Sequence, residues 1–365
     1  MIIKQLNLLN FKNLTQADIH FSDGINCIVG MNGSGKTNLI DSIYYLSFCK
    51  SFLNSVDSQN VNFDADYFLI QGQYSSGDRH DEVACSLKRG HKKAFKRNKK
   101  DYERLSDHIG HFPLVVISPA DEELINGASE ERRKYIDSVI SQFDKNYLSL
   151  IIRYTRLVLQ RNTLIKGYMQ NFNPAILDVY DAQLVDIAQS IYKARHLFLQ
   201  NLLPIFQKYY SFISNDREVV GIEYKSHLSS ANFAADLTQA RDRDLRVGYS
   251  TKGVHRDELE FSLSNNPIRK YGSQGQKKSY LIALKLAHLE LLTQKVGMIP
   301  ILLLDDIFDK LDQERGSQLI NLVTHSTFAQ IFITDTQKER LVKIVETTQK
   351  PYKVFDVANG QVSEN

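Results

Sequence analysis

The chain lacks tryptophan altogether, and among its 365 residues only three are cysteines and seven are prolines. Cys27, Cys49 and Cys85 lie far apart and form no C-x-x-C pair, so the sequence offers neither a zinc-site spacing nor a disulfide framework. Few prolines and no low-complexity tract argue against long disordered linkers. These absences leave a globular protein whose thiols are small buried side chains in a reducing compartment.

Membrane-spanning and export signals are also missing. No run approaches about 18 apolar residues, and the first residues, MIIKQLNLLNFKN, alternate polar and apolar side chains unlike a signal peptide. We therefore expect a soluble cytoplasmic protein with no membrane partner. The net charge is only +3, so overall charge identifies no ligand and the distribution of basic residues matters more.

Apolar patterning predicts strands near both ends of the chain and helices in the middle. Strands are expected at 2–9, 17–21, 25–29, 67–74, 82–87, 93–97, 114–117, 219–225, 258–264, 301–304 and 331–334, with a hairpin around Gly360 and an amphipathic helix at 279–294. Apolar residues three to four apart on both sides of a break at 167–174 predict an antiparallel helical hairpin with arms of about 45 Å. Two ordinary core helices fit that pattern equally well.

A glycine-rich octapeptide follows the strand expected at 25–29. Gly30-Met31-Asn32-Gly33-Ser34-Gly35-Lys36-Thr37 matches G-x-x-x-x-G-K-[ST] and leads into a helix. Glycines let successive N–H groups point at phosphate oxygens. Lys36 would reach the β- and γ-phosphates, and the Thr37 hydroxyl would ligate Mg²⁺. The sequence therefore predicts ATP binding here, against a chance glycine turn as the alternative.

An acidic strand end supplies the partner that such a loop needs. The apolar run at 301–304 ends in Asp305 and Asp306, and ligands of open α/β sheets lie at the carboxyl ends of strands. Asp305 would hold Mg²⁺, and Asp306 would orient or deprotonate the attacking water. A solvated acidic turn is the plainer reading of these two residues alone.

A third element stands shortly before that strand. Ser273, Gly275 and Gln276 precede a predicted helix, and a helix N-terminus with serine and glycine favours anions. The 264 residues from Thr37 to Ile301 (301 − 37) are too many for a compact nucleotide kinase. We therefore predict an α/β fold with a mixed, helix-flanked sheet, in which an ATPase lobe at 1–118 and 250–365 is split by a mostly helical lobe at 119–249.

Several blocks together resemble the RecF family, the bacterial recombination mediators among the ABC-type ATPases. Their positions follow the family order along nearly the whole chain: 32–38 with Asn38 among the nucleotide-binding residues, Lys50-Ser51, Ser118-Pro119, 127–137, 159–162, His255-Arg256-Asp257, 272–278, 302–308 and Leu311-Asp312. The resemblance implies an ABC head with a helical second lobe but without long coiled coils.

The family's activity gives further expectations by resemblance. Such proteins dimerise when ATP is sandwiched between two P-loops and two Ser-x-Gly-Gln signatures, so Ser273, Gly275 and Gln276 would contact the γ-phosphate bound in a second copy. Leu311-Asp312 would face the dimer. The family also implies weak, DNA-dependent ATP hydrolysis, DNA as a partner, and cooperation with RecR and RecO in loading a recombinase on gapped DNA.

The chain also departs from the family pattern. Leu53 stands where arginine is common, Val254 where proline precedes His-Arg-Asp, and Lys310 where an acidic or small residue is expected. Asp335 occupies the place of a transporter-type switch histidine. The glutamine loop of the wider class is missing, with Ser118-Pro119 near its place.

The densest basic segment runs from Lys88 to Lys100, with Phe95 among the charges. Such a hairpin neutralises phosphates in a salt-sensitive, sequence-independent way. The DNA contacts expected here are Lys92, Lys93, Lys96, Arg97, Lys99 and Lys100, and a solvated hairpin is the alternative. A smaller cluster, Arg132-Arg133-Lys134, fits structural ion pairing equally well.

Three other functions compete with an ATP-gated DNA repair factor. A transporter nucleotide-binding subunit is opposed by Asn38 and the absent switch histidine. A small-molecule kinase is opposed by the long gap between motifs. An ATP-binding scaffold without turnover is opposed by Asp306 as a second carboxylate.

Overall fold

The computed structural model describes residues 1–54, 56–167, 174–230, 232–307, 330–348 and 350–364. The chain divides into two compact units. Unit 1 comprises Met1–Asp121, Phe212–Asn215 and Gln274–Asn365, and unit 2 comprises Glu122–Ser211 and Asp216–Ser273. Within the described part of the chain, no helix has both the length and the apolar character that a membrane crossing requires.

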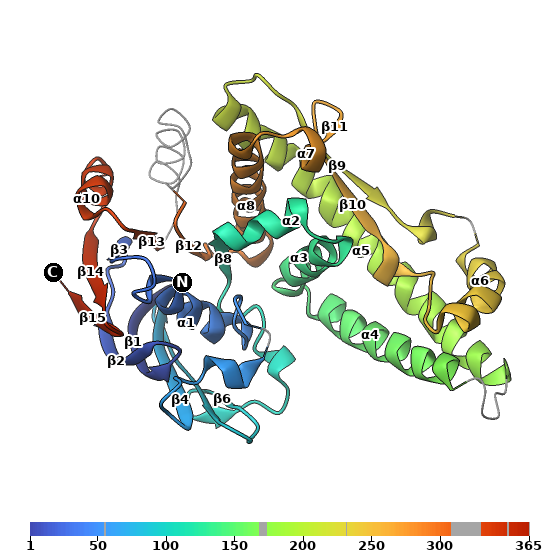
Figure 1. Ribbon diagram of the computed structural model, residues 1–365, viewed down its shortest axis with the longest axis horizontal. Helices are drawn as coiled ribbons and strands as arrows, with labels where there is room; N and C mark the ends of the chain where they lie inside the picture. The colour runs from blue at the N-terminus through green and yellow to red at the C-terminus, as the bar shows by residue number, and fades with distance from the viewer. Residues whose placement is uncertain (55, 168–173, 231, 308–329, 349, 365) are drawn as a thin grey trace. The chain divides into compact units, whose positions relative to one another are not determined.

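Unit 1 contains a six-stranded antiparallel sheet in the order β2-β1-β4-β5-β6-β7 (Figure 1). Its strands are β1 (Ile2–Phe11), β2 (Leu14–His20), β4 (Tyr67–Ser76), β5 (Arg79–Lys88), β6 (Ala94–Arg97) and β7 (Lys100–Asp101). Buried residues alternate with exposed ones along β2 and β5, as expected for a sheet with one face on the core. The antiparallel hairpins are therefore readable from the sequence, with bounds shifted by a few residues.

The second sheet of unit 1 has the order β15-β14-β3-β13-β12-β8, and only β15 runs antiparallel to its neighbour. Its strands are β3 (Ile25–Val29), β8 (Leu114–Ile117), β12 (Ile301–Leu304), β13 (Ile331–Asp335), β14 (Tyr352–Ala358) and β15 (Gln361–Glu364). Every residue of β3, β12 and β13 is buried, as in parallel strands covered on both faces. The strand β3 has β13 on one side and β14 on the other.

Helix α1 (Lys36–Phe48) packs between the two sheets, touching β1, β4 and β5 of one and β13 and β8 of the other. Eleven of its 13 residues are buried, including the polar Asp41, Ser42 and Ser47, so the helix exposes little of its surface to solvent. Helix α8 (Gln274–Val296) contacts β8, and α10 (Lys338–Glu346) contacts β3. On α8, Lys285 Nζ lies 2.5 Å from Asp121 Oδ1 and donates to Val116 O at 3.0 Å.

Unit 2 is mainly helical and carries a three-stranded antiparallel sheet, β11-β10-β9. Its helices are α2 (Glu122–Asn126), α3 (Ser129–Ser141), α4 (Lys145–Lys166), α5 (Pro174–Ser214), α6 (Phe233–Val247) and α7 (Ile268–Tyr271), and its strands are β9 (Val220–Lys225), β10 (Glu258–Leu263) and β11 (Asn266–Pro267). Residues 250–273 belong to unit 2 because β10 pairs with β9 and α7 contacts β10. The contact-based boundary at 274 therefore differs from the sequence-based one at 250.

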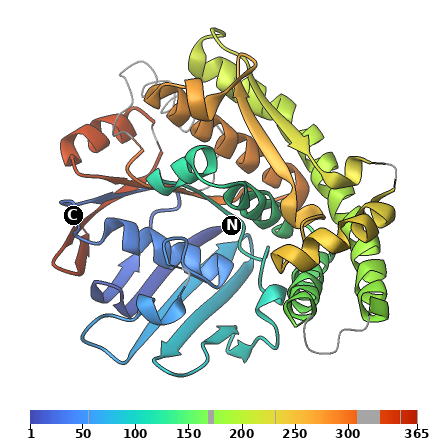
Figure 2. The ribbon, with the colours of Figure 1, turned by 45° about the vertical axis from the view of Figure 1, so that its right-hand side comes forward.

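The expected helical hairpin has a different form. Its first arm is broken into α3 and α4, because the Asp144 carboxylate accepts a hydrogen bond from Tyr147 N at 2.9 Å and starts α4 as a new helix. Its second arm, α5, has 41 residues and is therefore about 60 Å long at ~1.5 Å per residue. Figure 2 shows α4 and α5 running side by side in green and yellow-green.

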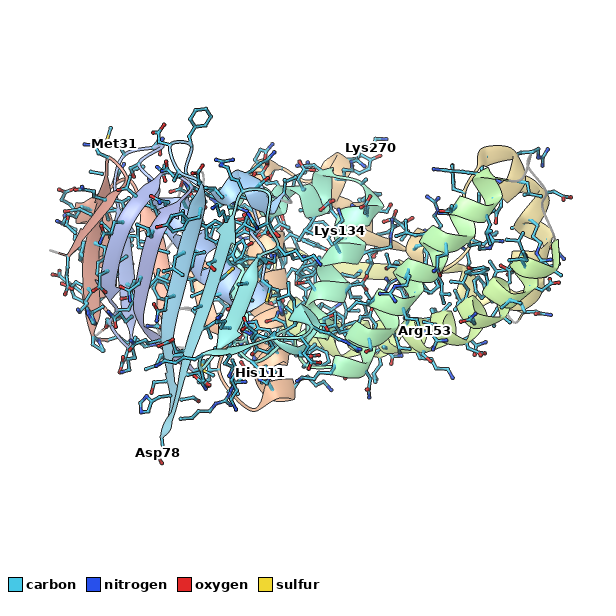
Figure 3. All side chains as sticks on the ribbon, turned by 90° about the horizontal axis from the view of Figure 1, so that it is seen from below. Met31, Asp78, His111, Lys134, Arg153 and Lys270 are labelled. Carbon is cyan, nitrogen blue, oxygen red and sulfur yellow. The ribbon has the colours of Figure 1, made fainter. Side chains whose placement is uncertain are left out.

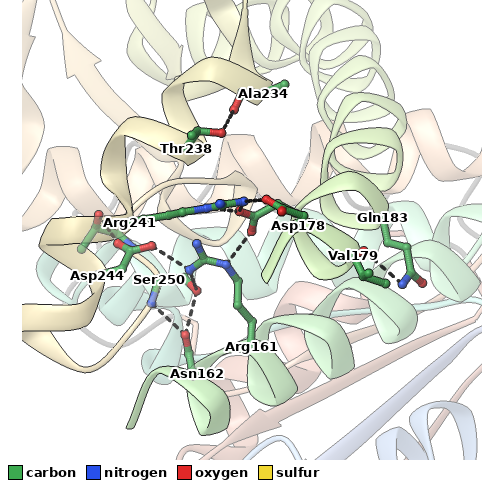
Figure 4. Close-up of polar contacts among 12 residues, drawn as sticks. Arg161, Asn162, Asp178, Val179, Gln183, Ala234, Thr238, Arg241, Asp244 and Ser250 are labelled. Atoms are coloured by element: carbon green, nitrogen blue, oxygen red, sulfur yellow. Dashed lines mark hydrogen bonds and ion pairs between the residues drawn. The ribbon is translucent and has the colours of Figure 1, made fainter. Parts of the chain in front are cut away.

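Buried ion pairs hold the helices of unit 2 together (Figure 4). Arg161 on α4 is fully buried, and its guanidinium donates to Asp181 Oδ1 at 2.7 Å, to Asp244 Oδ2 at 2.6 Å and to Ser250 Oγ at 2.8 Å. Asn162 Oδ1 in turn accepts from Ser250 N and Oγ, both at 2.7 Å. The Arg161-Asn162 pair of the 159–162 block therefore joins α4, α5 and α6.

A second buried arginine organises the His255-Arg256-Asp257 block. Arg195 on α5 donates to Asp257 Oδ2 and to Val254 O, both at 2.8 Å, and to the two Asp137 oxygens at 3.0 Å. His255 Nδ1 lies 2.9 Å from the Tyr154 hydroxyl, and burial lowers the pKa of its imidazole to about 4. These residues are consequently structural partners in unit 2.

Candidate nucleotide site

The glycine loop is shaped by close backbone approaches. A Cβ on Gly30 would lie 2.4 Å from Val357 O, and one on Gly35 would lie 2.7 Å from Asn13 Oδ1. Gly35 also has φ of +118°, in the left-handed region that favours glycine, and it stands immediately before α1. Met31, Asn32 and Gly33 are exposed, and Figure 3 shows Met31 at the end of the strands opposite Asp78. The loop therefore lies at the carboxyl end of β3, as its sequence predicts.

Lys36 is folded into this loop. Its side chain is only 4% exposed, and Nζ donates to Gly30 O at 2.9 Å and to Met31 O at 3.1 Å. Ser34 Oγ is buried and has no hydrogen-bond partner among the described residues. Among the described residues, the Lys36 ammonium is bound only by neutral carbonyls, and the Ser34 hydroxyl in the same loop has no partner. Phosphate oxygens would satisfy both groups, so the residues present fit a nucleotide phosphate.

The acidic strand end lies directly beside the first turn of α1. The Thr37 hydroxyl donates to Asp305 Oδ1 at 3.1 Å, and the Thr334 hydroxyl donates to the same oxygen at 2.8 Å. Burial raises the pKa of the Asp305 carboxyl, the nearby Asp306 charge adds to this, and the two threonine hydrogen bonds oppose it. A hydroxyl and a carboxylate oxygen at this distance fit a shared Mg²⁺, which prefers oxygen ligands.

Asp306 follows in a strained conformation. Its φ of +45° lies in the left-handed region, which costs a non-glycine residue about 1 kcal/mol or more. Its amide nitrogen donates to Thr334 Oγ1 at 2.8 Å, which holds the backbone in this conformation. The backbone therefore turns at Asp306 and does not continue as an extended strand.

Two residues of the site escaped the sequence analysis. Thr334 enters it because β13 lies between β3 and β12, so that its carboxyl end stands between the P-loop and Asp305. Asn13, after β1, donates through Nδ2 to Ser34 O at 3.1 Å and accepts from Asn38 Nδ2 at 2.7 Å. Asn38 thus braces Asn13 and, through it, the loop. Neither residue belongs to a local pattern that would have revealed it.

The Ser-x-Gly-Gln element coincides with a helix start. Helix α8 begins at Gln274, so Gly275 and Gln276 lie in its first turn and the exposed Ser273 immediately precedes it. The sequence analysis began this helix at 279, which was wrong because the polar residues 274–278, which lack an apolar period, already belong to the helix. The earlier start brings these residues to the helix end where N–H groups lack intrahelical acceptors.

The positions that depart from the family pattern differ in their environments. Asp335 is buried, pairs with Arg340 at 2.7 Å and accepts from Gln337 N at 2.9 Å, so its carboxylate is engaged at the start of α10. Leu53 is 41% exposed and Val254 is fully buried. Phe308, Lys310 and Leu311-Asp312 lie outside the described residues.

The basic segment contains both exposed and internally paired side chains. Lys93 lies 2.8 Å from Asp57 Oδ2 and also donates to Cys49 O, and Arg97 pairs with Asp81 at 2.8 Å. Phe95 is buried, so it cannot stack on a base. The exposed members of the predicted set are Lys92, Lys96, Lys99 and Lys100, of which Lys96 pairs loosely with Asp101 at 3.5 Å.

The smaller cluster on α3 is engaged in ion pairs within unit 2. Arg132 lies 2.8 Å from Glu258 Oε1, and Lys134 lies 3.0 Å from both Glu130 and Glu131. Arg133 donates to Asp257 O at 2.6 Å. The ion-pairing interpretation is therefore confirmed for Arg132 and Lys134, whereas Arg133 binds a backbone carbonyl.

A P-loop between a buried strand and a central helix, with an acidic strand end across an intervening strand, defines a P-loop nucleotide-binding domain. The model of the RecF/RecN/SMC N-terminal domain matches residues 2–363. With relatives that are 49% identical over their whole length, the chain belongs to the RecF family.

Two such relatives carry the description "DNA replication and repair protein RecF". The one from Bacteroides thetaiotaomicron is 49% identical, covering 100% of this chain and 99% of its own. The one from Flavobacterium johnsoniae is 44% identical, covering 98% of this chain and 100% of its own. The family is thus one of DNA replication and repair proteins, which supports the repair reading over the transporter alternative.

Solved structures agree with this family and its fold. The structure of the recombination mediator protein RecF with ATP, in the RecFOR pathway, has a TM-score of 0.88 at 30% identity and covers 100% of this chain and 99% of that one. A structure of the Smc head bound to the C-terminal winged-helix domain of ScpA has a TM-score of 0.59 at 16% identity. The second likeness concerns the fold alone.

Proposed function

We propose that this chain binds ATP with Mg²⁺ at the loop of residues 30–37 and uses hydrolysis as a switch in DNA replication and repair. The observation that carries the proposal is the junction of Thr37, Asp305 and Thr334, in which two hydroxyls converge on one buried carboxylate oxygen at 3.1 and 2.8 Å. Such a carboxylate beside a P-loop threonine is the arrangement that Mg²⁺ and a triphosphate require. The RecF structure with ATP, 30% identical, supports the same ligand.

Each residue of the site then has a definite task. Lys36 would exchange its bonds to Gly30 O and Met31 O for β- and γ-phosphate oxygens, and Ser34 Oγ would gain its missing partner. Thr37 and Asp305 would hold the metal, which supplies charge neutralisation between the phosphates. Asp306 would orient the attacking water and accept its proton.

The signature residues belong to the proposed dimer. Ser273, Gly275 and Gln276 lie at the start of a 23-residue helix, whose N-terminus favours an anion by about 0.3–1 kcal/mol at an exposed site. In a dimer, the same residues from a second copy would approach the γ-phosphate bound at Lys36. ATP would thereby act as the switch that closes two copies, and DNA, RecR-type and RecO-type proteins would be the partners of the closed form.

The first test concerns ATP-dependent dimerisation. Lys36→Ala removes the cation that would bind the phosphates, so we expect at least ~10- to 100-fold weaker ATP binding from lost charged hydrogen bonds, and no dimer with ATP. Light scattering with and without ATP measures the dimer, and Lys343→Ala, which changes an exposed lysine on α10, is the control. A full-sized ATP-dependent dimer of Lys36→Ala would contradict the proposal.

The second test separates the two aspartates. Asp306→Asn should retain ATP and Mg²⁺ but lose roughly 10²- to 10⁴-fold in turnover, because the water loses its base, and the ATP-bound dimer should accumulate. Asp305→Asn should instead weaken Mg²⁺-dependent ATP binding. Phosphate release and nucleotide affinity are measured for both variants. Undiminished phosphate release by Asp306→Asn would contradict the proposal that Asp306 activates the attacking water. If the unchanged protein released no phosphate, the alternative of an ATP-binding scaffold without turnover would be favoured.

For DNA contact, the exposed Lys92, Lys96, Lys99 and Lys100 are the proposed phosphate contacts among the predicted set, with Lys93 and Arg97 acting mainly through their internal pairs. Each lysine that contacts duplex phosphate should add about 0.9 to the slope of log affinity against log salt. Titrations of single lysine-to-alanine variants at several salt concentrations check this, and unchanged slopes in all four would refute the assignment.

A further inference from the structure

The hydroxyl of Thr334 lies between the two acidic residues that follow β12. It donates a hydrogen bond to Asp305 Oδ1 at 2.8 Å and accepts one from Asp306 N at 2.8 Å. A hydroxyl has one proton to donate, and here Asp305 accepts it, whereas a lone pair of the same oxygen accepts the Asp306 amide. One atom of β13 therefore binds both the carboxylate proposed to hold Mg²⁺ and the backbone of the residue proposed to activate water.

The two aspartates depend on this hydroxyl to different degrees. Asp305 Oδ1 also accepts from the Thr37 hydroxyl at 3.1 Å, and Asp305 N donates to Ile117 O at 2.8 Å in the pairing of β12 with β8. For Asp306 N, the hydrogen-bond acceptor among the described residues is Thr334 Oγ1. Loss of the Thr334 hydroxyl would thus leave Asp305 with two other hydrogen bonds, whereas the Asp306 amide would lose this acceptor.

The backbone conformation of Asp306 needs such support. In an extended strand, neighbouring side chains point to opposite faces of the sheet, so a continued β12 would place Asp306 and Asp305 on different faces. The φ of +45° at Asp306 interrupts this alternation, in a region that few residues other than glycine adopt. The hydrogen bond to Thr334 Oγ1 therefore stabilises the conformation on which the direction of the Asp306 side chain depends.

Thr334 is itself fixed by its place in β13. The residue is fully buried, its strand lies between β3 and β12, and its branched side chain has few rotamers. The next residue, Asp335, is engaged elsewhere, because its carboxylate binds the Arg340 guanidinium at 2.7 Å and accepts from Gln337 N at 2.9 Å. The group that β13 contributes to the nucleotide site is therefore a rigidly held hydroxyl.

We propose that Thr334 is a positioning residue for ATP hydrolysis, whose hydroxyl holds Asp306 where its carboxylate orients the attacking water. The inference rests on the hydrolysis proposed above and adds the group that sets the geometry of the water-activating residue. A displacement of about 1 Å at a reacting group lowers a rate by up to ~100-fold, whereas ATP binding depends on the P-loop backbone and Lys36. Turnover and ATP affinity should therefore respond differently to a change at Thr334.

The direct test is Thr334→Val, which replaces the hydroxyl by a methyl group of similar size. Phosphate release in a single turnover should fall by about 10- to 100-fold, and the Kd of ATP with Mg²⁺ should change by less than about three-fold. Thr334→Ser keeps the hydroxyl and should stay within about three-fold of the unchanged protein in both measurements. Thr293→Val is the matched control, because the hydroxyl of this partly buried threonine on α8 donates to Leu289 O, and it should change neither quantity.

A double variant separates positioning from a general loss of structure. Thr334→Val added to Asp306→Asn should slow phosphate release no further than Asp306→Asn alone, because the hydroxyl acts through a carboxylate that is already absent. The ATP-bound dimer should accumulate in Thr334→Val as in Asp306→Asn. The melting temperature without nucleotide shows that each variant is folded, and Thr334→Ala carries the same expectations if Thr334→Val does not fold.

Three outcomes would overturn the inference. The first is undiminished turnover of Thr334→Val at saturating ATP, whether or not ATP affinity falls. The second is an equal loss of turnover in Thr334→Ser and Thr334→Val, which would assign the effect to packing. The third is a loss that multiplies in full with that of Asp306→Asn, which would make Thr334 independent of Asp306. In each case ATP hydrolysis by the unchanged protein, abolished in Asp306→Asn, would leave the proposed function standing, whereas an unchanged protein without hydrolysis would overturn both.

Discussion

The P-loop of unit 1 and the arginine network of unit 2 both bury positive charge, but they satisfy it differently. Arg161 and Arg195 each meet two carboxylates at 3.0 Å or less. Among the described residues, Lys36 donates only to the carbonyls of Gly30 and Met31. The charge in unit 2 is neutralised within the chain, whereas Lys36 forms no ion pair with a described residue.

This contrast separates structural from ligand-binding residues better than the family motifs do. His255-Arg256-Asp257 and the P-loop stand out equally in the sequence. In the structure, Asp257 Oδ2 is bound by the Arg195 guanidinium and by the Tyr224 hydroxyl, whereas the described residues offer Lys36 only backbone carbonyls. Substitutions in the first group should therefore change stability, and substitutions around the second should change affinity.

The largest expected effect comes from Arg195→Met. Removing this guanidinium leaves Asp137 and Asp257 without their cation in a buried site, and breaking such a pair costs roughly 3–5 kcal/mol. Thermal unfolding should shift by many degrees, while ATP affinity of the folded protein stays within about two-fold. Arg153→Met, which removes an exposed arginine on α4, is the control and should change neither. Weakened ATP binding with normal stability in Arg195→Met would contradict the assignment of Arg195 to a purely structural role.

A smaller effect is expected at His108, a fully buried histidine of unit 1. Burial lowers the pKa of its imidazole to about 4, against the opposing hydrogen bond to Leu46 O. Between pH 6.5 and 4 the unfolded chain binds this proton and the folded chain does not, so stability falls on acidification by up to ~1.4 kcal/mol per pH unit.

The pH dependence of the melting temperature tests this point. His108→Phe should flatten the decline between pH 7 and pH 5, whatever its effect on stability at neutral pH. The exposed His80→Ala is the control and should leave the slope unchanged. An equally steep decline in His108→Phe would show that unit 1 owes its acid sensitivity to other groups.

The smallest effect is expected from Asn13→Ala, which removes the support of the P-loop without removing a ligand. Its amide donates to Ser34 O at 3.1 Å and accepts from Asn38 at 2.7 Å, and one or two hydrogen bonds contribute about 0.5–1.5 kcal/mol each. ATP affinity should fall by roughly 2- to 150-fold with little change in melting temperature. Asn266→Ala, at an exposed position of β11 in unit 2, controls for the loss of an amide. A large loss of stability with unchanged ATP affinity would instead show that Asn13 has a structural role, like the buried arginines of unit 2.

Local patterns predicted the parts of the site that are contiguous in sequence. The P-loop and Asp305-Asp306 follow from a motif and from a buried strand end, and strands β3, β8 and β12 coincide with their expected ranges. Thr334 and Asn13 could not be predicted, because each enters through strand order or a side-chain contact that spans distant residues.

The basic segment was harder to interpret because charge patterns do not reveal partners. Asp57 and Asp81 lie 36 and 16 positions from the lysine and arginine that they bind, so Lys93 and Arg97 looked as available as Lys92. The break between α3 and α4 was likewise hidden, because the apolar period continues through the segment that Asp144 caps.

The position of β3 between β13 and β14 has a consequence for synthesis on the ribosome. Ile25 pairs with Ile331, which the ribosome adds 306 residues later (331 − 25), or about 15–60 seconds at ~5–20 residues per second. Unit 2 is complete once residue 273 has emerged. Until residues 331–358 have followed, β3 has neither of its two partner strands, so the P-loop lacks the sheet that positions it.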